Sequence, residues 1–157
     1  MKEITPFLWF DTQAEEAARF YVSIFKNSSI DSISRYNAAG PGAPGNVMTV
    51  SFTLDGRPFT ALNGGPIYKF TEAISFSVGC ESEEEVDFLW EALSAGGAPG
   101  PCGWLKDRWG VSWQIVPTAL MELLGDPDRA KAARVMAAMM KMSKLDIAGL
   151  RAAAAAA

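Results

Sequence analysis

The most constraining feature of this sequence is a pattern of secondary-structure elements that occurs twice. In its first copy, an apolar run at residues 4–10 is typical of a buried strand. Residues 12–15 (TQAE) match a capping box, in which Thr and Glu satisfy the first free N–H groups of a helix. Apolar residues at helical spacing then predict a helix that ends near Lys26: Ala17, Phe20, Tyr21, Ile24 and Phe25.

Three strands are predicted after this helix, at residues 29–36, 47–54 and 57–63. The segment 37–46 contains GPGAPG and is predicted to be a loop. Asp55-Gly56 is typical of a hairpin turn between the last two strands. The first copy is therefore strand, helix, strand, strand, strand.

The second copy has the same order of features. Alternation at residues 73–78 predicts a strand, and residues 82–85 (SEEE) form a second capping box. One apolar helical face follows and ends at Gly96-Gly97: Val86, Leu89, Trp90 and Leu93. Strands are predicted at 102–106 and 111–116. The repeat indicates a duplicated α+β structure in which each half has one helix, so the halves must share a sheet or pair their sheets.

The remainder of the chain is predicted to be helical. A short helix is expected around residues 120–124, and Asp126-Pro127 is predicted to begin a second helix with an apolar Ala and Met face. Residues 143–146 are expected to cap a final helix. The six alanines at 152–157 carry no packing information, so this end is expected to be frayed or foreign to the natural chain. The Met-rich segment 136–142 is interpreted as a packing face, with a dimer contact as the alternative.

Composition excludes several classes of function. The sequence has no histidine among 157 residues, which removes the commonest general base and the commonest metal ligand. A net charge of −4 and the absence of a basic cluster argue against nucleic-acid binding. No apolar run is long enough to cross a membrane, and no secretory signal is visible, so a cytoplasmic protein is expected. The two cysteines, Cys80 and Cys102, are interpreted as reduced thiols; a nucleophilic Cys102 beside Lys106 and Arg108 is the alternative.

Four segments together carry a resemblance to a known family: 62–66 (LNGGP), 74–78 (ISFSV), 84–87 (EEVD) and above all 102–117 (CGWLKDRWGVSWQIVP). They closely resemble the PhnB-like proteins of the glyoxalase/bleomycin-resistance/extradiol-dioxygenase (vicinal oxygen chelate) superfamily, whose members often carry the name 3-demethylubiquinone-9 3-methyltransferase. The resemblance implies two βαβββ modules that form a curved mixed sheet around a cavity, usually within a homodimer. It places the modules at about 1–66 and 70–117 of a single domain, followed by a helical extension at 118–151 and the alanine tail 152–157.

The resemblance also implies where the superfamily's divalent metal would be held. The corresponding positions fall at Pro6, at Leu62 or Asn63, at Ala73 or its neighbour Glu72, and at Gln114. Proline, leucine and alanine have no ligating side chain, and neutral amides hold a hard cation weakly. We therefore expect no metal or other cofactor.

Strand alternation predicts which residues face the cavity and bind a ligand. If Gln114 faces the cavity, Ser112 does too, and Ser75 and Ser77 share one face of their own strand. The predicted ligand-binding residues are Gln114, Asn63, Ser112, Ser75, Ser77 and Trp104. The alternatives are a solvated sheet face for the serines and a core or interface anchor for Trp104.

Three functions remain open from the sequence. The first is a metal-free protein that binds a small organic molecule, as resistance proteins do. The second is an enzyme of lyase, isomerase or dioxygenase type or, by family name alone, a methyltransferase. No glycine-rich strand–helix turn near the N-terminus supports S-adenosylmethionine binding. The third is a purely structural or partner-binding dimer. The expected partners are a small molecule and a second copy of the chain, with no nucleic acid and no membrane.

Overall fold

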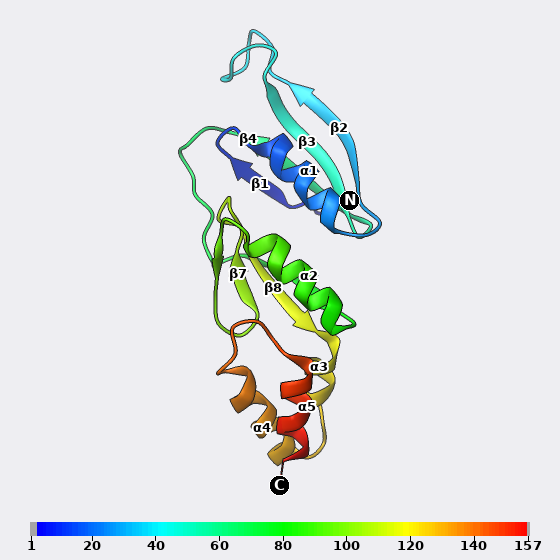
Figure 1. The fold of residues 1–157 in the computed structure, drawn as a ribbon. Coiled ribbons are helices and arrows are strands. Elements are labelled where there is room, and N and C mark those ends of the chain that lie inside the picture. The colour runs from blue at the N-terminus through cyan, green and yellow to red at the C-terminus, as the bar shows by residue number, and fades with distance from the viewer. Residues whose placement is uncertain (1–2, 157) are drawn as a thin grey trace. The chain divides into compact units, whose positions relative to one another are not determined.

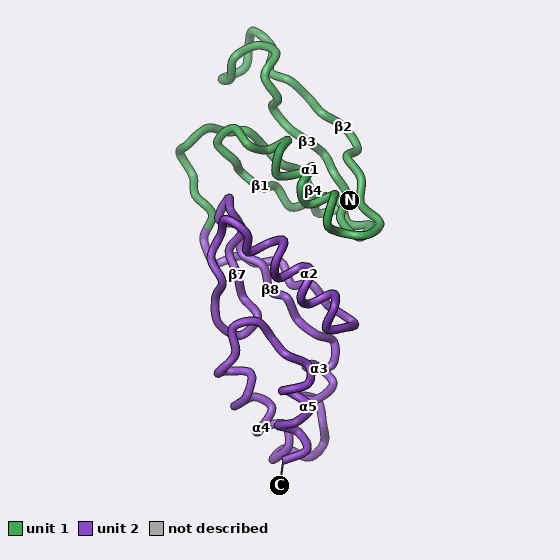
Figure 2. Tube along the Cα trace, in the orientation of Figure 1, with its two compact units in different colours: residues 1–70 green, residues 71–157 purple. Residues whose placement is uncertain are grey.

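Two compact units, Met1–Phe70 and Thr71–Ala157, make up the chain (Figure 2). A computed structural model describes residues 3–156. None of the helices in this range is long and apolar enough to span a bilayer. Each unit is described separately below.

The first unit contains β1 (Phe7–Phe10), α1 (Ala14–Ile24), β2 (Ser29–Arg35), β3 (Val47–Leu54) and β4 (Arg57–Asn63) (Figure 1). Its strands are ordered β1-β4-β3-β2, with β1 parallel to β4 and the other pairs antiparallel. Asp55 and Gly56 join β3 to β4 with φ angles of 46° and 75°, as a tight hairpin turn requires.

The second unit repeats this arrangement with β5 (Ser75–Cys80), α2 (Glu83–Ser94), β6 (Ala98–Pro99), β7 (Trp104–Lys106) and β8 (Ser112–Pro117) (Figure 1). The strand order is β5-β8-β7-β6, and β5 is again parallel to the last strand. The predicted α+β class with two βαβββ modules is therefore confirmed. Sequence analysis missed β6, because its two residues lie in a segment rich in proline and glycine.

Each helix covers one face of its own sheet. In α1, Ala17 and Tyr21 are fully buried, and the Tyr21 ring stacks on Phe52 of β3 at 6.3 Å between centroids. In α2, the buried side chains Val86, Leu89 and Leu93 belong to a helix that packs on β8. The opposite face of each sheet carries no helix of its own module and is termed the helix-free face, although in the second sheet Val116, at the end of that face, packs against the C-terminal helices.

The two helices begin differently, and one predicted capping box is wrong. Ser82 caps α2 as predicted, accepting a hydrogen bond from Glu85 N at 3.3 Å. In the described chain, no side chain at the N-cap position of α1 makes a cap hydrogen bond, and that position is Gln13 rather than Thr12. The N–H of Ala14 is bound instead by Asn63 Oδ1, at 2.8 Å. A long-range partner has replaced the local capping residue.

Three further helices complete the second unit: α3 (Thr118–Leu124), α4 (Arg129–Met139) and α5 (Ile147–Ala155). They share a core whose buried members are Leu120, Val135, Leu145, Leu150 and Ala154. Met139 and Met142 pack against this core, whereas Met136 and Met140 are exposed.

Two predictions for this region are wrong. The N-cap of α4 is Asp128, which accepts hydrogen bonds from Ala130 N and Lys131 N, and not Asp126. The alanine tail is not frayed where it is described: residues 152–155 continue α5, and Arg134 donates hydrogen bonds to the carbonyl oxygens of residues 153 and 154. Residue 157 lies outside the described residues.

Candidate functional site

The helix-free face of the second sheet brings together five of the six predicted ligand-binding residues. Strand β8 alternates, so Trp113 and Ile115 are buried towards α2 while Ser112 and Gln114 lie on the other face. The strand register places Ser75 opposite Ser112, Ser77 opposite Gln114 on one side, and Trp104 opposite Gln114 on the other. The predicted alternation of β8 and β5 thus gathers these five residues on one surface.

Hydrogen bonding differs sharply between the two polar residues of β8. Gln114 Nε2 donates to Ser75 Oγ at 2.8 Å, which fixes the orientation of the amide. Ser112 is only 1% exposed, and its hydroxyl has no hydrogen-bond partner within residues 3–156. A buried hydroxyl without a partner costs about 1–3 kcal/mol. This position is therefore the most unusual one on the face.

A cavity of about 520 Å³ opens beside this face within the second unit. Trp104, Lys106 and Ser112 line it together with Glu72 and the segment 98–102. Lys106 forms an ion pair with Glu72. The hydrogen bond from Lys106, and then a hydrogen bond with the backbone of Glu72, hold the pKa of the Glu72 carboxyl below its usual value. The cavity therefore combines an aromatic wall with a charged, solvent-exposed rim.

The turn that joins β7 to β8 is held by a buried carboxylate. Asp107 is 3% exposed; its Oδ1 accepts from Trp109 N and Val111 N, and its Oδ2 accepts from Trp113 Nε1, all at 3.0 Å. Three consecutive charged residues, 106–108, are typical of a charged turn or of local ion pairs, but Asp107 is buried and binds the turn from inside. The carboxylate positions β8, and with it Ser112 and Gln114.

Asn63, the sixth predicted residue, lies in the first unit and on a helix-covered face. Its Oδ1 accepts from Ala14 N, and its Nδ2 donates to Val47 O at 3.1 Å. Both ends of the amide are thus engaged in joining β4 to α1 and β3. The structure gives this residue a structural role in the first unit.

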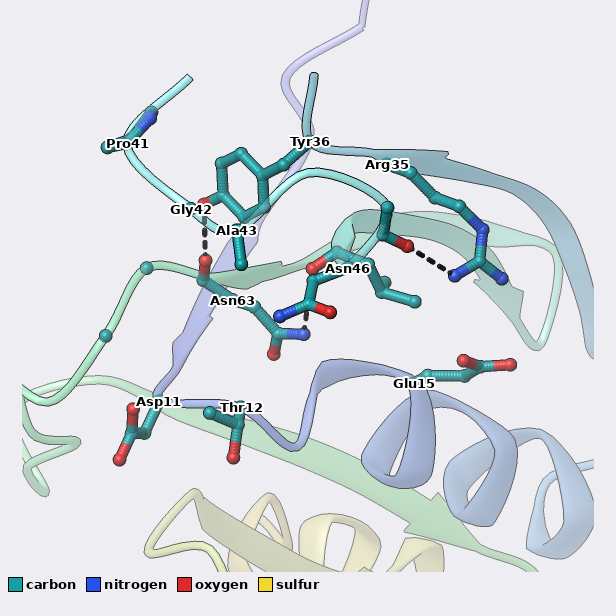
Figure 3. Close-up of a pocket in the computed structure, with 14 residues that line it drawn as sticks. Asp11, Thr12, Glu15, Arg35, Tyr36, Pro41, Gly42, Ala43, Asn46 and Asn63 are labelled. Carbon is teal, nitrogen blue, oxygen red and sulfur yellow. Dashed lines mark hydrogen bonds between the residues drawn. The ribbon is translucent and has the colours of Figure 1, made fainter. Parts of the chain in front are cut away.

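Sequence analysis missed a second cavity, which lies in the first unit and measures about 490 Å³ (Figure 3). The loop between β2 and β3 folds over it, with Arg35 Nη1 donating to Gly45 O at 3.0 Å and Tyr36 Oη donating to Asn63 O at 2.6 Å. Asp11, Thr12 and Glu15 lie on its other side (Figure 3). The composition of the loop predicts its irregular backbone but not this arrangement over the cavity, which depends on the hydrogen bonds of Arg35 and Tyr36.

The residues at the superfamily's metal positions do not form a metal site. Pro6, Leu62 and Ala73 have no ligating side chain, Gln114 is bonded to Ser75, and Glu72 is paired with Lys106. Within residues 3–156 there is also no group of three His, Cys, Asp or Glu side chains that could hold a metal. The donor set present does not fit a divalent ion.

Solved structures define the class of protein. The chain is similar to a PhnB protein from Bacillus cereus described as a putative 3-demethylubiquinone-9 3-methyltransferase, with 41% identity, a TM-score of 0.67, and coverage of 74% of this chain and 100% of that one. A protein from Pseudomonas aeruginosa (20% identity, TM-score 0.61, coverage 74% and 98%) and a fosfomycin resistance protein from Listeria monocytogenes (14%, 0.52, 78% and 97%) share the fold. The chain therefore has the fold of PhnB and fosfomycin resistance proteins.

A match to a family model identifies the family within this class. The family model described as 3-demethylubiquinone-9 3-methyltransferase matches residues 2–116. This chain belongs to that PhnB-like family, as the four segments noted above predict. No curated protein is similar enough to count as a match. Helices α3–α5 lie beyond the matched range.

Proposed function

We propose that this chain binds a small organic molecule on the helix-free face of its second sheet, without a metal ion. The observation that carries the proposal concerns Ser112, which lines a cavity of about 520 Å³ and whose buried hydroxyl has no partner within residues 3–156. A polar group of a bound ligand would supply the missing hydrogen bond and recover part of its cost.

The surrounding side chains restrict the chemistry of the ligand. Trp104 offers a flat apolar surface, and the rim supplies one positive and one negative charge from Lys106 and Glu72. The Gln114 amide is already oriented by Ser75. We therefore expect a ligand with an apolar or aromatic body and at least one hydroxyl or carbonyl group that reaches Ser112.

A thermal-shift experiment tests this proposal. The probes are bleomycin, fosfomycin, a short-chain ubiquinone and S-adenosylmethionine, each with and without EDTA. A ligand at 100 times its Kd stabilises the folded state by about 2.7 kcal/mol, so a bound probe raises the Tm by several degrees. We expect a shift that survives EDTA. A shift abolished by EDTA, or no shift with any probe, contradicts the proposal.

Substitution at Ser112 sharpens the experiment because two effects have opposite signs. Ser112→Ala removes an unpaired buried hydroxyl, so the free protein keeps or gains stability, while the ligand-induced shift decreases. Gln114→Ala also reduces the shift. Ser32→Ala, on an exposed position of β2, is the matched control and leaves the shift unchanged. Equal shifts in wild type, Ser112→Ala and Gln114→Ala place the ligand elsewhere and overturn the proposal.

The second candidate is an enzyme, and the family description is what favours it. The turn from β1 to α1 consists of Asp11, Thr12 and Gln13 and lacks the glycines of a nucleotide-binding turn, which argues against methyl transfer from S-adenosylmethionine. Mass spectrometry of a 3-demethylubiquinone analogue incubated with the protein and S-adenosylmethionine decides between the two. A methylated product formed catalytically selects the enzyme.

We also propose that the protein is a cytoplasmic homodimer. Support comes from large apolar side chains that stay exposed within each unit, such as Phe7 at 63% and Ile74 at 74% exposure. Light scattering after size-exclusion chromatography measures the mass in solution. Twice the chain mass supports the proposal, and a monomer at micromolar concentration contradicts it.

A further inference from the structure

The β6–β7 loop and the segment that follows α4 bring two sulfur atoms into contact. Cys102 Sγ lies 3.8 Å from Met140 Sδ. Cys102 belongs to the part of the chain that the family model matches, whereas Met140 follows α4 in the helical region beyond it. The pair therefore exists only because this chain carries the C-terminal helices.

The backbone holds both sulfur-bearing segments in place. Cys102 N donates to Met142 O at 2.8 Å, and Gly103 N donates to Ser143 O at 2.7 Å. Ser143 Oγ returns a hydrogen bond to Gly100 O at 2.6 Å. Cys102 itself has a φ of +57°, a left-handed conformation that is uncommon outside glycine. The two loops thus present the thiol and the thioether side by side without relying on side-chain contact alone.

Both sulfur-bearing side chains reach the surface of the second unit. Cys102 lines the cavity of about 520 Å³ and is partly exposed, and Met140 is 62% exposed. Ser112, whose buried hydroxyl lacks a partner within residues 3–156, lines the same cavity. An ion bound to the Cys102 sulfur would therefore border this cavity.

We propose that Cys102 and Met140 form a binding site for a soft monovalent cation of the Cu(I) class. Thiolate and thioether are the ligands that select Cu(I) over hard divalent ions. With metal–sulfur bonds of about 2.3 Å, the 3.8 Å separation corresponds to an S–metal–S angle of about 110°. That angle suits three-coordinate binding, with one position left for a further ligand. On binding, the Cys102 thiol loses its proton to solvent and forms the metal–sulfur bond.

This site is separate from the superfamily's divalent metal positions and does not depend on the organic-ligand proposal. It uses sulfur atoms that the organic-ligand proposal leaves unassigned. Loss of Cu(I) binding in a protein that still binds an organic probe, or the reverse, distinguishes the two proposals.

Anaerobic titration of the reduced full chain with Cu(I), in competition with a chromophoric Cu(I) chelator, measures the affinity. We expect one Cu(I) per chain and thiolate-to-metal absorption in the ultraviolet. Because a thiolate is the stronger ligand, Cys102→Ser weakens binding about a hundred-fold or more, and Met140→Leu weakens it about ten-fold. Ag(I) should bind with the same stoichiometry.

The chain offers a matched control for each substitution. Cys80 is fully buried and Met121 is exposed at 64% but lies on α3, so Cys80→Ala and Met121→Leu should bind Cu(I) as wild type does. Thermal unfolding confirms that each variant is folded. Wild-type affinity in Cys102→Ser or in Met140→Leu, loss of binding in Cys80→Ala, or no stoichiometric Cu(I) in wild type overturns the proposal.

Discussion

The two βαβββ modules share one topology but solve the same structural problems with different residues. Asn63 and Pro117 occupy equivalent places, since each ends the last strand of its module and pairs with the final residue of the first strand, Phe10 or Cys80. Asn63 caps α1 through its side chain. Proline has no side-chain hydrogen-bonding group, and α2 uses its own Ser82 instead. A conserved topology therefore does not require a conserved capping residue.

The same register exposes a difference between the helix-free faces. Phe7 pairs with Thr60 in the first module, and the equivalent pair in the second is Ser77 and Gln114. Trp9 is on the same face as Phe7, and its indole donates to Gly65 O at 2.9 Å. The first module thus presents aromatic rings where the second presents Ser77 and Gly79. This contrast favours the second module as the one that binds a ligand with a polar group.

The turns before the last strands provide the largest testable contrast. The β7–β8 turn depends on the three N–H groups bound by Asp107, whereas the β3–β4 turn depends on backbone conformation at Asp55 and Gly56. Asp107→Ala leaves buried donors unpaired, so we expect a loss of about 3 kcal/mol or more in the free energy of unfolding. Denaturant unfolding measures this loss. Asp55→Asn, which tolerates the left-handed conformation, should change the free energy by less than about 0.5 kcal/mol.

A smaller effect is expected from the cap that crosses the first module. Asn63→Ala removes the acceptor of Ala14 N and the donor to Val47 O, and it should lower the free energy of unfolding by about 1–2 kcal/mol. Thr12→Ala is the control that distinguishes the observed cap from the predicted capping box, and it should have almost no effect. The reverse ranking would show that the local capping box operates in solution.

The third expected effect is a pH dependence confined to the second module. Burial, and secondarily the charge of Glu85, raises the pKa of the Cys80 thiol from 9.0 to about 11. Between these two values the unfolded chain ionises first, so the contribution of Cys80 to stability decreases as the pH rises from 9 to about 11. Unfolding of wild type and Cys80→Ala at pH 8 and 10.5 measures the difference.

The Cys80 prediction has a clear opposite outcome. If both proteins lose stability equally between the two pH values, the thiol is not protected from ionisation. Alkylation at pH 8 gives an independent measure, since Cys102 should react and Cys80 should not.

Local sequence patterns predicted the fold well where the physical cause is local. Alternation predicted the bounds of β3, the Asp55-Gly56 turn predicted its partner β4, and the Ser82 capping box predicted the start of α2. The same alternation correctly separated Ser112 and Gln114 from Trp113 and Ile115. These features depend on side-chain periodicity and on residues at most four apart.

Features that depend on distant partners were not predictable. The cap on α1 comes from Asn63, 49 residues away, which no local pattern indicates. The buried role of Asp107 depends on the fold of β8 over the turn, and a single charged residue between Lys106 and Arg108 looks like surface. Likewise, the contact between Cys102 and Met140 spans 38 residues. Contacts between residues far apart in the sequence, rather than local conformational propensity, determine the roles of these residues.

The hydrogen bonds between the β6–β7 loop and the segment 142–143 have a consequence for how this protein is shortened. A fragment that stops at residue 116, where the family match ends, would leave Cys102 N–H and Gly103 N–H without their acceptors. It would also remove Leu145, whose side chain packs directly over Gly103, and Lys144, which pairs with Asp87 of α2. The C-terminal helical region thus stabilises the second module. A fragment shortened to the matched range would lack these hydrogen bonds and contacts.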